Sequence, residues 1–93
     1  EERHRRITTG ILNRTLEEIL AKNPPFTRTG RLNKVFYATQ VSSEPPTFVI
    51  FMSRPDELQQ SYMRYIKNQF YEKFGFYGNP VRIYLRERKK NEG

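Results

Sequence analysis

Hydrophobic residues recur at steps of three and four in two stretches of the chain, and this spacing predicts two amphipathic helices. In the first helix, Thr8 is a suitable N-terminal cap. Pro24 disfavours helical geometry at Asn23, so this helix should end there. The residues of the first helix that should face the core are Leu12, Leu16, Ile19 and Leu20.

The second predicted helix is the longer of the two and leads directly into a strand. Pro55 suits its first turn, and either Ser53 or Asp56 supplies the cap, so the helix should start close to these residues. Gly75 follows the last hydrophobic position, where a left-handed residue commonly closes a helix. The hydrophobic stripe of this helix is Leu58, Tyr62, Tyr65, Ile66, Phe70 and Phe74.

Three shorter runs rich in β-branched and aromatic residues predict strands at 35–41, 47–52 and 81–86. The first two runs are joined by only a few residues, which makes them antiparallel neighbours. The second and third are joined through the long helix, and such a crossover places its strands parallel. The last strand alternates, with Val81, Ile83 and Leu85 on one face and Arg82, Tyr84 and Arg86 on the other.

The predicted fold is an α+β two-layer sandwich in the order helix–strand–strand–helix–strand, with two helices on one face of a three-stranded mixed sheet. The second strand is apolar on both faces, so the face without helices should carry an apolar patch. In the first strand we expect Val35, Tyr37 and Thr39 on one face and Phe36 and Ala38 on the other. Such a patch is either an interface or a surface that loops and termini cover. The residues we expect to dock on another domain are Phe36, Val49 and Phe51.

The chain is strongly basic, with 17 Lys and Arg against 10 Asp and Glu, a net charge of +7 and a pI near 10.0. This balance favours a polyanionic partner such as RNA, although a solvated surface is the alternative. Residues 22–34 contain four Lys or Arg and no acidic residue, in a segment that we expect to be a flexible loop. This loop either attracts an anionic ligand or is an ordinary solvated loop, and the sequence favours the two equally. Tyr84, between two arginines, either stacks on a base or packs across strands. The residues we expect to contact RNA phosphates are Arg28, Arg31, Lys34, Lys67, Arg82 and Arg86.

The chain offers few of the residue combinations that an active site usually needs. The chain has no cysteine and a single histidine, His4, which excludes a thiol nucleophile and an ordinary zinc site. No Gly-x-x-x-x-Gly-Lys-Ser/Thr phosphate loop occurs, and no apolar run approaches the ~18–20 residues of a membrane span. We therefore expect no catalytic residue, metal or cofactor in this chain. The absence of cysteine fits a reducing compartment.

Several segments of the chain resemble a known family. They are 34–41 (KVFYATQV), 45–51 (PPTFVIF), 61–69 (SYMRYIKNQ) and 74–83 (FGFYGNPVRI), with 5–7 (RRI) and 23–25 (NPP). In this order they resemble the C-terminal KH-like domain of the bacterial GTPase Der, also called EngA. The resemblance implies a KH-like domain at 7–88, preceded by the end of an interdomain linker at 1–6 and followed by a basic tail at 89–93.

The resemblance also implies that this domain follows two GTPase domains, which would bind GTP and magnesium. The family assists assembly of the large ribosomal subunit. The expected partners are therefore ribosomal RNA and the GTPase domains of the same chain, in the cytoplasm, with no membrane contact and the isolated domain a monomer. The alternative is a docking module that senses the arrangement of the GTPase domains and does not touch RNA.

One feature of ordinary KH domains is placed differently here. Such a domain clamps nucleotides with a Gly-x-x-Gly loop between two helices. In this chain Gly75-Phe76-Tyr77-Gly78 lies between a helix and a strand, where we expect it to end the helix and let Phe76 pack back on it. Contacts to phosphates and to RNA shape are then expected rather than sequence-specific recognition.

Overall fold

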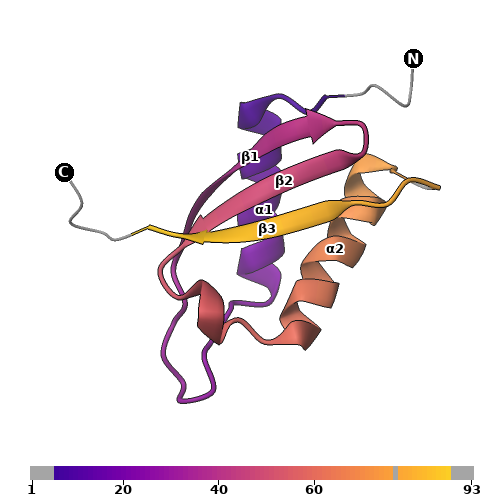
Figure 1. The fold of residues 1–93 in the computed structure, drawn as a ribbon. Coiled ribbons are helices and arrows are strands. Elements are labelled where there is room, and N and C mark those ends of the chain that lie inside the picture. The colour runs from indigo at the N-terminus through magenta and orange to yellow at the C-terminus, as the bar shows by residue number, and fades with distance from the viewer. Residues whose placement is uncertain (1–5, 77, 89–93) are drawn as a thin grey trace.

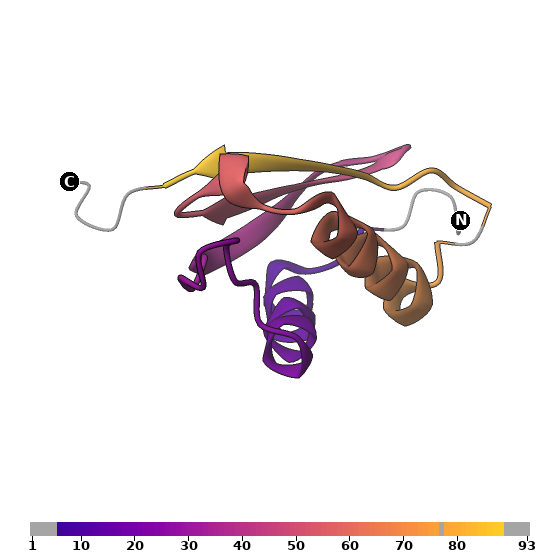
Figure 2. The same cartoon turned by 90° about the horizontal axis from the view of Figure 1, so that it is seen from below.

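The computed structural model describes residues 6–76 and 78–88, so the predicted tail and most of the predicted linker lie outside the described residues, as do His4 and Tyr77. The described chain forms two layers, with both helices on one face of a three-stranded sheet (Figure 1, Figure 2). This arrangement confirms the predicted α+β sandwich. Its elements are α1 (Thr9–Lys22), β1 (Val35–Ser43), β2 (Pro46–Met52), the short 3-10 helix η2 (Pro55–Glu57), α2 (Gln60–Phe74) and β3 (Arg82–Glu87).

The strands lie in the order β1-β2-β3. β1 and β2 are antiparallel and β2 and β3 are parallel, as the lengths of their connections predicted. β2 is therefore the central strand, which explains its apolar composition. On the helix side Phe48, Ile50 and Met52 are almost completely buried. On the other face Val49 and Phe51 remain partly exposed.

Phe48 occupies the centre of the core. Its ring centroid lies 5.0 Å from that of Phe70, 6.5 Å from that of Phe74 and 6.0 Å from that of Phe76. Phe76 follows Gly75, whose φ of 71° closes α2 in the left-handed conformation that glycine adopts easily. Phe76 is only 4% exposed, so the prediction that it packs back on the helix is confirmed.

α1 is attached to β1 by its apolar stripe and by one amide side chain. Leu12, Leu16 and Ile19 are buried, as predicted. Asn13 Nδ2 donates to the carbonyl of Ala38 at 2.9 Å, and the N–H of Ala38 donates to Asn13 Oδ1 at 2.7 Å. β1 is an edge strand, so the N–H and the carbonyl of Ala38 have no partner on a neighbouring strand. The two bonds to Asn13 supply that partner.

Side-chain hydroxyls hold both ends of α1. Thr8 Oγ1 accepts a hydrogen bond from the N–H three residues on, which confirms it as the cap. At the other end Tyr65 donates to the carbonyl of Ile19 at 2.7 Å. Tyr62 donates to the carbonyl of Asn23. The last carbonyls of a helix lack intrahelical partners, so these tyrosines satisfy α1 and connect it to α2.

The predicted start of the second helix is wrong. The N–H of Leu58 bonds to the carbonyl of Pro55 at 3.3 Å, which closes a 3-10 turn, and Leu58 itself is extended, with ψ of 126°. An extended residue cannot continue an α-helix, so α2 starts at Gln60. Neither expected cap serves this helix. The hydroxyl of Ser53 instead accepts a bond from the N–H of Lys34.

The predicted alternation in the first strand is also wrong at its beginning. A bulge lies between Val35 and Tyr37: these residues are two apart in β1, but their partners Met52 and Phe51 are adjacent in β2. Val35 is paired with the buried Met52 and packs against the core. Tyr37 is paired with Phe51 on the uncovered face. The two side chains that we expected on one face therefore lie on opposite faces.

The tyrosine contacts between the helices predict a pH dependence of stability. Burial, together with the neighbouring Tyr65, raises the pKa of Tyr62 well above its ordinary value. The folded state then holds this proton more tightly than the unfolded state, so the stabilisation is complete below about pH 10 and is lost as the pH rises further. Urea unfolding of Tyr62→Phe should show a weaker fall in unfolding free energy above pH 10 than the wild type. Equal slopes would contradict this role.

Candidate nucleic-acid interface

The six cationic residues predicted to contact RNA fall in three places. Arg28, Arg31 and Lys34 precede or adjoin β1, and all three are exposed. Arg82 and Arg86 are exposed on β3. Lys67 is half-buried on α2, in the helical layer. The structure therefore does not bring Lys67 to the face that carries the β3 arginines.

The segment expected to be a flexible loop contains an ordered hairpin, which extends at the lower end of the molecule in Figure 1. Phe26 and Leu32 form a β-bridge across it. The N–H of Thr27 donates to the carbonyl of Arg31 at 2.7 Å, and the N–H of Arg31 donates to Thr27 Oγ1 at 3.1 Å. The hairpin exposes about half of both Phe26 and Leu32, two surface residues that the sequence patterns did not single out.

A buried amide fixes the hairpin to the end of β2. Asn33 is 1% exposed, and its Nδ2 donates to the carbonyl of Arg54 at 2.8 Å. Its Oδ1 accepts from the N–H of Arg54 at 3.0 Å. The N–H of Ser53 donates to the carbonyl of Lys34 at 2.8 Å, and that of Arg88 donates to the carbonyl of Met52 at 2.9 Å. Lys34 and Arg88 are therefore held at the same end of the sheet.

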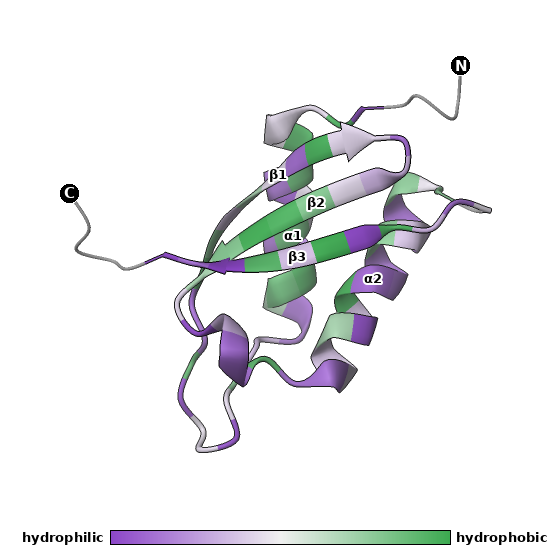
Figure 3. Cartoon of the chain, viewed as in Figure 1, coloured by the Kyte–Doolittle hydropathy of each residue, from purple (hydrophilic) through white to green (hydrophobic). Residues whose placement is uncertain are grey.

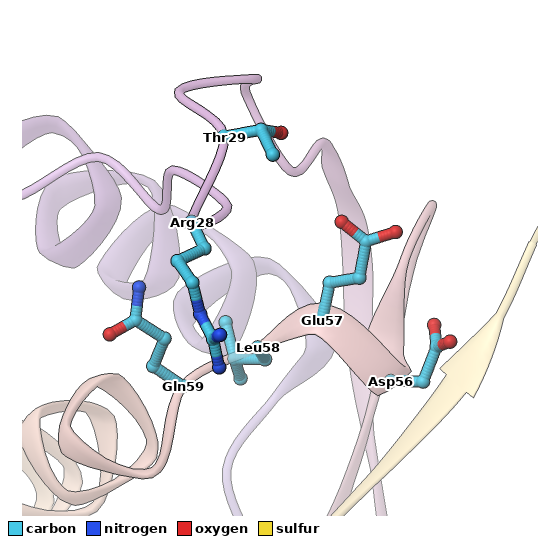
Figure 4. Close-up of a pocket in the computed structure, with 6 residues that line it drawn as sticks. All are labelled: Arg28, Thr29, Asp56, Glu57, Leu58 and Gln59. Carbon is cyan, nitrogen blue, oxygen red and sulfur yellow. The ribbon is translucent and has the colours of Figure 1, made fainter.

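Arg28 differs from the other hairpin cations because carboxylates lie near it. It lines a hollow of about 380 Å³ together with Asp56, Glu57, Leu58 and Gln59. Figure 4 shows its guanidinium directed toward Leu58, with both carboxylates turned away. The hollow is electrostatically mixed because two acids line it with Arg28, although the carboxylate of Glu57 is paired with Arg54 at 3.7 Å. Arg28 is accordingly a weaker candidate for a phosphate contact than Arg31 or Lys34.

The uncovered face of the sheet carries the β3 arginines. Tyr84 is 51% exposed and in register with Val49, and Arg86 is in register with Phe51. Packing across strands thus covers only part of Tyr84. The alternate residues, Ile83 and Leu85, pack against the core on the opposite face, as predicted.

A further arginine, which the sequence patterns assigned to neither the strand nor the site, also reaches β1. The guanidinium carbon of Arg88 lies 5.4 Å from the ring centroid of Phe36 and 5.6 Å from that of Tyr37. Tyr37 also stacks on Phe51, with centroids 4.7 Å apart. Arg88 continues the two-residue repeat of Arg82, Tyr84 and Arg86, and this repeat is the sequence signal that could have found it.

The residues predicted to dock on another domain occupy the same region. Val49 and Phe51 lie on the uncovered face of β2, which forms the hydrophobic centre of the sheet in Figure 3. Phe36 lies at the bulge of β1, under Arg88. The three strands contain one acidic residue, Glu87, and its register partner Met52 belongs to the buried face. The uncovered face is therefore apolar in the middle and positively charged along β3.

The described residues lack two other kinds of site. Neither of their helices is long and apolar enough to cross a membrane. They also contain no group of three or more His, Asp or Glu side chains that could hold a metal ion. The uncovered sheet face and the hairpin therefore remain the strongest candidates for a binding site.

A family model, the KH-domain-like region at the C-terminus of EngA bacterial GTPase enzymes, matches residues 6–86. The chain belongs to this family. It is 41% identical over 93 residues to GTPase Der of Synechocystis sp., covering 99% of this chain and 21% of that protein. It is 44% identical to GTPase Der of Trichodesmium erythraeum, covering 98% of this chain and 20% of that protein, and 47% identical to GTPase Der of Caldanaerobacter subterraneus subsp. tengcongensis, covering 95% and 20%. The chain spans about a fifth of the length of these relatives.

The anchoring of the hairpin predicts a large cost for a small substitution. Asn33→Ala would remove the two hydrogen bonds between this side chain and the backbone of Arg54 and leave the N–H of Arg54 without its partner, which should destabilise the domain by about 1–3 kcal/mol. Asn68→Ala, at an exposed position of α2, is the matched control and should change stability by less than about 0.5 kcal/mol. Urea denaturation measures both. Similar costs for the two variants would show that Asn33 does not anchor the hairpin.

Proposed function

We propose that this EngA-family domain binds ribosomal RNA of the large-subunit precursor, as one part of a tandem-GTPase assembly factor that acts in the cytoplasm. The observation that best supports the proposal is the row of exposed arginines on β3, Arg82 and Arg86, on a sheet face that neither helix covers. Guanidinium groups on such a face can neutralise phosphates, and within the described residues neither arginine is in an ion pair.

The proposed interface continues from β3 to the base of the hairpin. Arg88 and Lys34 are bonded to adjacent backbone positions at the end of β2, so their charges lie at one end of the sheet. Arg31 extends the positive surface along the hairpin, and Arg28 contributes less because of its acidic neighbours. These contacts would position the domain on RNA and carry no base sequence information. GTP and magnesium would belong to the GTPase domains, and none of these residues is assigned a catalytic role.

The second candidate function is docking on the GTPase domains of the same protein. The specific observation in its favour is the partial exposure of Val49 and Phe51 in the middle of the uncovered face, with Phe36 at its edge. Apolar side chains in such a position commonly mark a protein interface. This function competes with RNA for the same face, so the two require separate tests.

The RNA proposal predicts an effect that depends on where charge is removed. We expect Arg82→Glu with Arg86→Glu, and Arg31→Glu with Lys34→Glu, each to weaken binding of a ribosomal RNA fragment by roughly tenfold or more at ~0.1 M salt, since each pair neutralises about two phosphates. Fluorescence anisotropy at several salt concentrations measures the affinity. The salt dependence should also become shallower, by about 0.7–0.9 in slope for each phosphate that the variant no longer neutralises.

The matched control changes the same charge in the helical layer. Arg14→Glu with Arg64→Glu replaces two exposed arginines, one on each helix, and should retain most of the affinity. A control variant that binds as weakly as the β3 variant would mean that RNA responds only to net charge. Wild-type binding that is unchanged from low to several hundred millimolar salt would overturn the phosphate mechanism.

The docking candidate predicts sensitivity to a charge in the apolar centre of the face. Val49→Glu should abolish association with a GTPase segment supplied as a separate protein, because burying a carboxylate in the apolar centre of the face costs its hydration. Ile11→Glu introduces the same charge at an exposed position of α1 and should leave association unchanged. Isothermal titration calorimetry measures both. Association that survives Val49→Glu would place docking on another surface.

A further inference from the structure

Tyr84 has an exposed ring with no partner among the described residues. It lies on the uncovered sheet face with about half of its surface exposed. Its hydroxyl makes no hydrogen bond, and its ring makes no aromatic or cation contact, within the described part of the chain. An exposed tyrosine ring without such contacts offers a flat apolar surface to a ligand.

Two arginines flank this ring on the same face. Arg82 and Arg86 lie two residues before and after Tyr84, about 7 Å away along the strand on each side. The row therefore reads cation, aromatic ring, cation. A base stacked on the ring would have its flanking phosphates within reach of the two guanidinium groups, which is the combination that single-strand binding surfaces use.

A second aromatic position lies across the sheet. Tyr37 is 40% exposed on β1, stacked on Phe51 and approached by the guanidinium of Arg88. Tyr37 and Tyr84 lie on the two outer strands with β2 between them, so roughly 10 Å separates their strands. An extended RNA strand that crosses the sheet could stack on both rings. Arg88, which follows β3 and lies over the ring of Tyr37, could then bind a phosphate of the same strand.

We infer that the uncovered face binds an unpaired segment of RNA, with one base stacked on Tyr84 and its phosphates on Arg82 and Arg86. The inference rests on the proposed RNA-binding function and specifies that the RNA bound at this face is single-stranded. In a duplex the faces of the bases are hidden because each base stacks on its neighbours, so a duplex would offer this site only its backbone. A protein partner is the less favoured occupant, because it would have to supply an acidic group on each side of Tyr84 to pair with Arg82 and Arg86, whereas a nucleic acid carries a phosphate on each side of a base.

The test compares a single-stranded octaribonucleotide with the same strand annealed to its complement, using fluorescence anisotropy and the 93-residue chain. Tyr84→Leu keeps apolar bulk but removes the ring, and should weaken single-strand binding roughly tenfold while changing duplex binding less than about twofold. Tyr84→Phe keeps the ring and should bind both RNAs as the wild type does. Ile11→Ala, at an equally exposed position on α1, should change neither affinity.

Tyrosine fluorescence supplies a second readout, because the chain has six tyrosines and no tryptophan. A base stacked on Tyr84 should quench part of the emission, and Tyr84→Phe should lose that part of the change while retaining affinity. Equal effects of Tyr84→Leu on both RNAs, or no effect on either, would overturn stacking while leaving RNA binding intact. A wild-type chain that binds neither RNA would overturn the proposed function as well.

Discussion

Both helices lie on one face of the sheet, and this one-sided packing determines what the rest of the molecule can do. Phe48, at the centre of the middle strand, joins the sheet to the aromatic residues of α2. Asn13 joins α1 to the free edge of β1. Neither helix reaches the opposite face, where β2 is still apolar. This face therefore has an apolar centre and arginines along β3. The arginines support the proposal of RNA binding, and the apolar centre supports the proposal of docking.

Local sequence patterns were sufficient to predict most of the fold. The stripe of Leu12, Leu16 and Ile19 specified the buried side of α1, and alternation in 81–86 specified the two faces of β3. Gly75 marked the end of α2 because a left-handed residue there depends on local conformational cost. The pairing of the strands followed from the lengths of their connections, which are also visible in the sequence.

The features that sequence could not provide depend on contacts between distant residues. The bulge beside Phe36 moved Val35 to the core, and nothing in the alternation of this strand predicts it. The hairpin is ordered because Asn33 bonds to Arg54, 21 residues later. The same dependence applies to the candidate site. Charge alone selected Lys67, which lies in the other layer, and passed over Arg88, whose contacts with β1 exist only in the folded chain.

The central claim is that RNA occupies the face opposite the helices. Backbone amide chemical shifts of the ¹⁵N-labelled chain, recorded during titration with single-stranded RNA, test it most directly. We predict the largest shift changes at Val49, Phe51, Tyr84 and Arg86, with little change along the solvent side of α1 and α2. Changes concentrated on the helices, with the sheet unaffected, would contradict it.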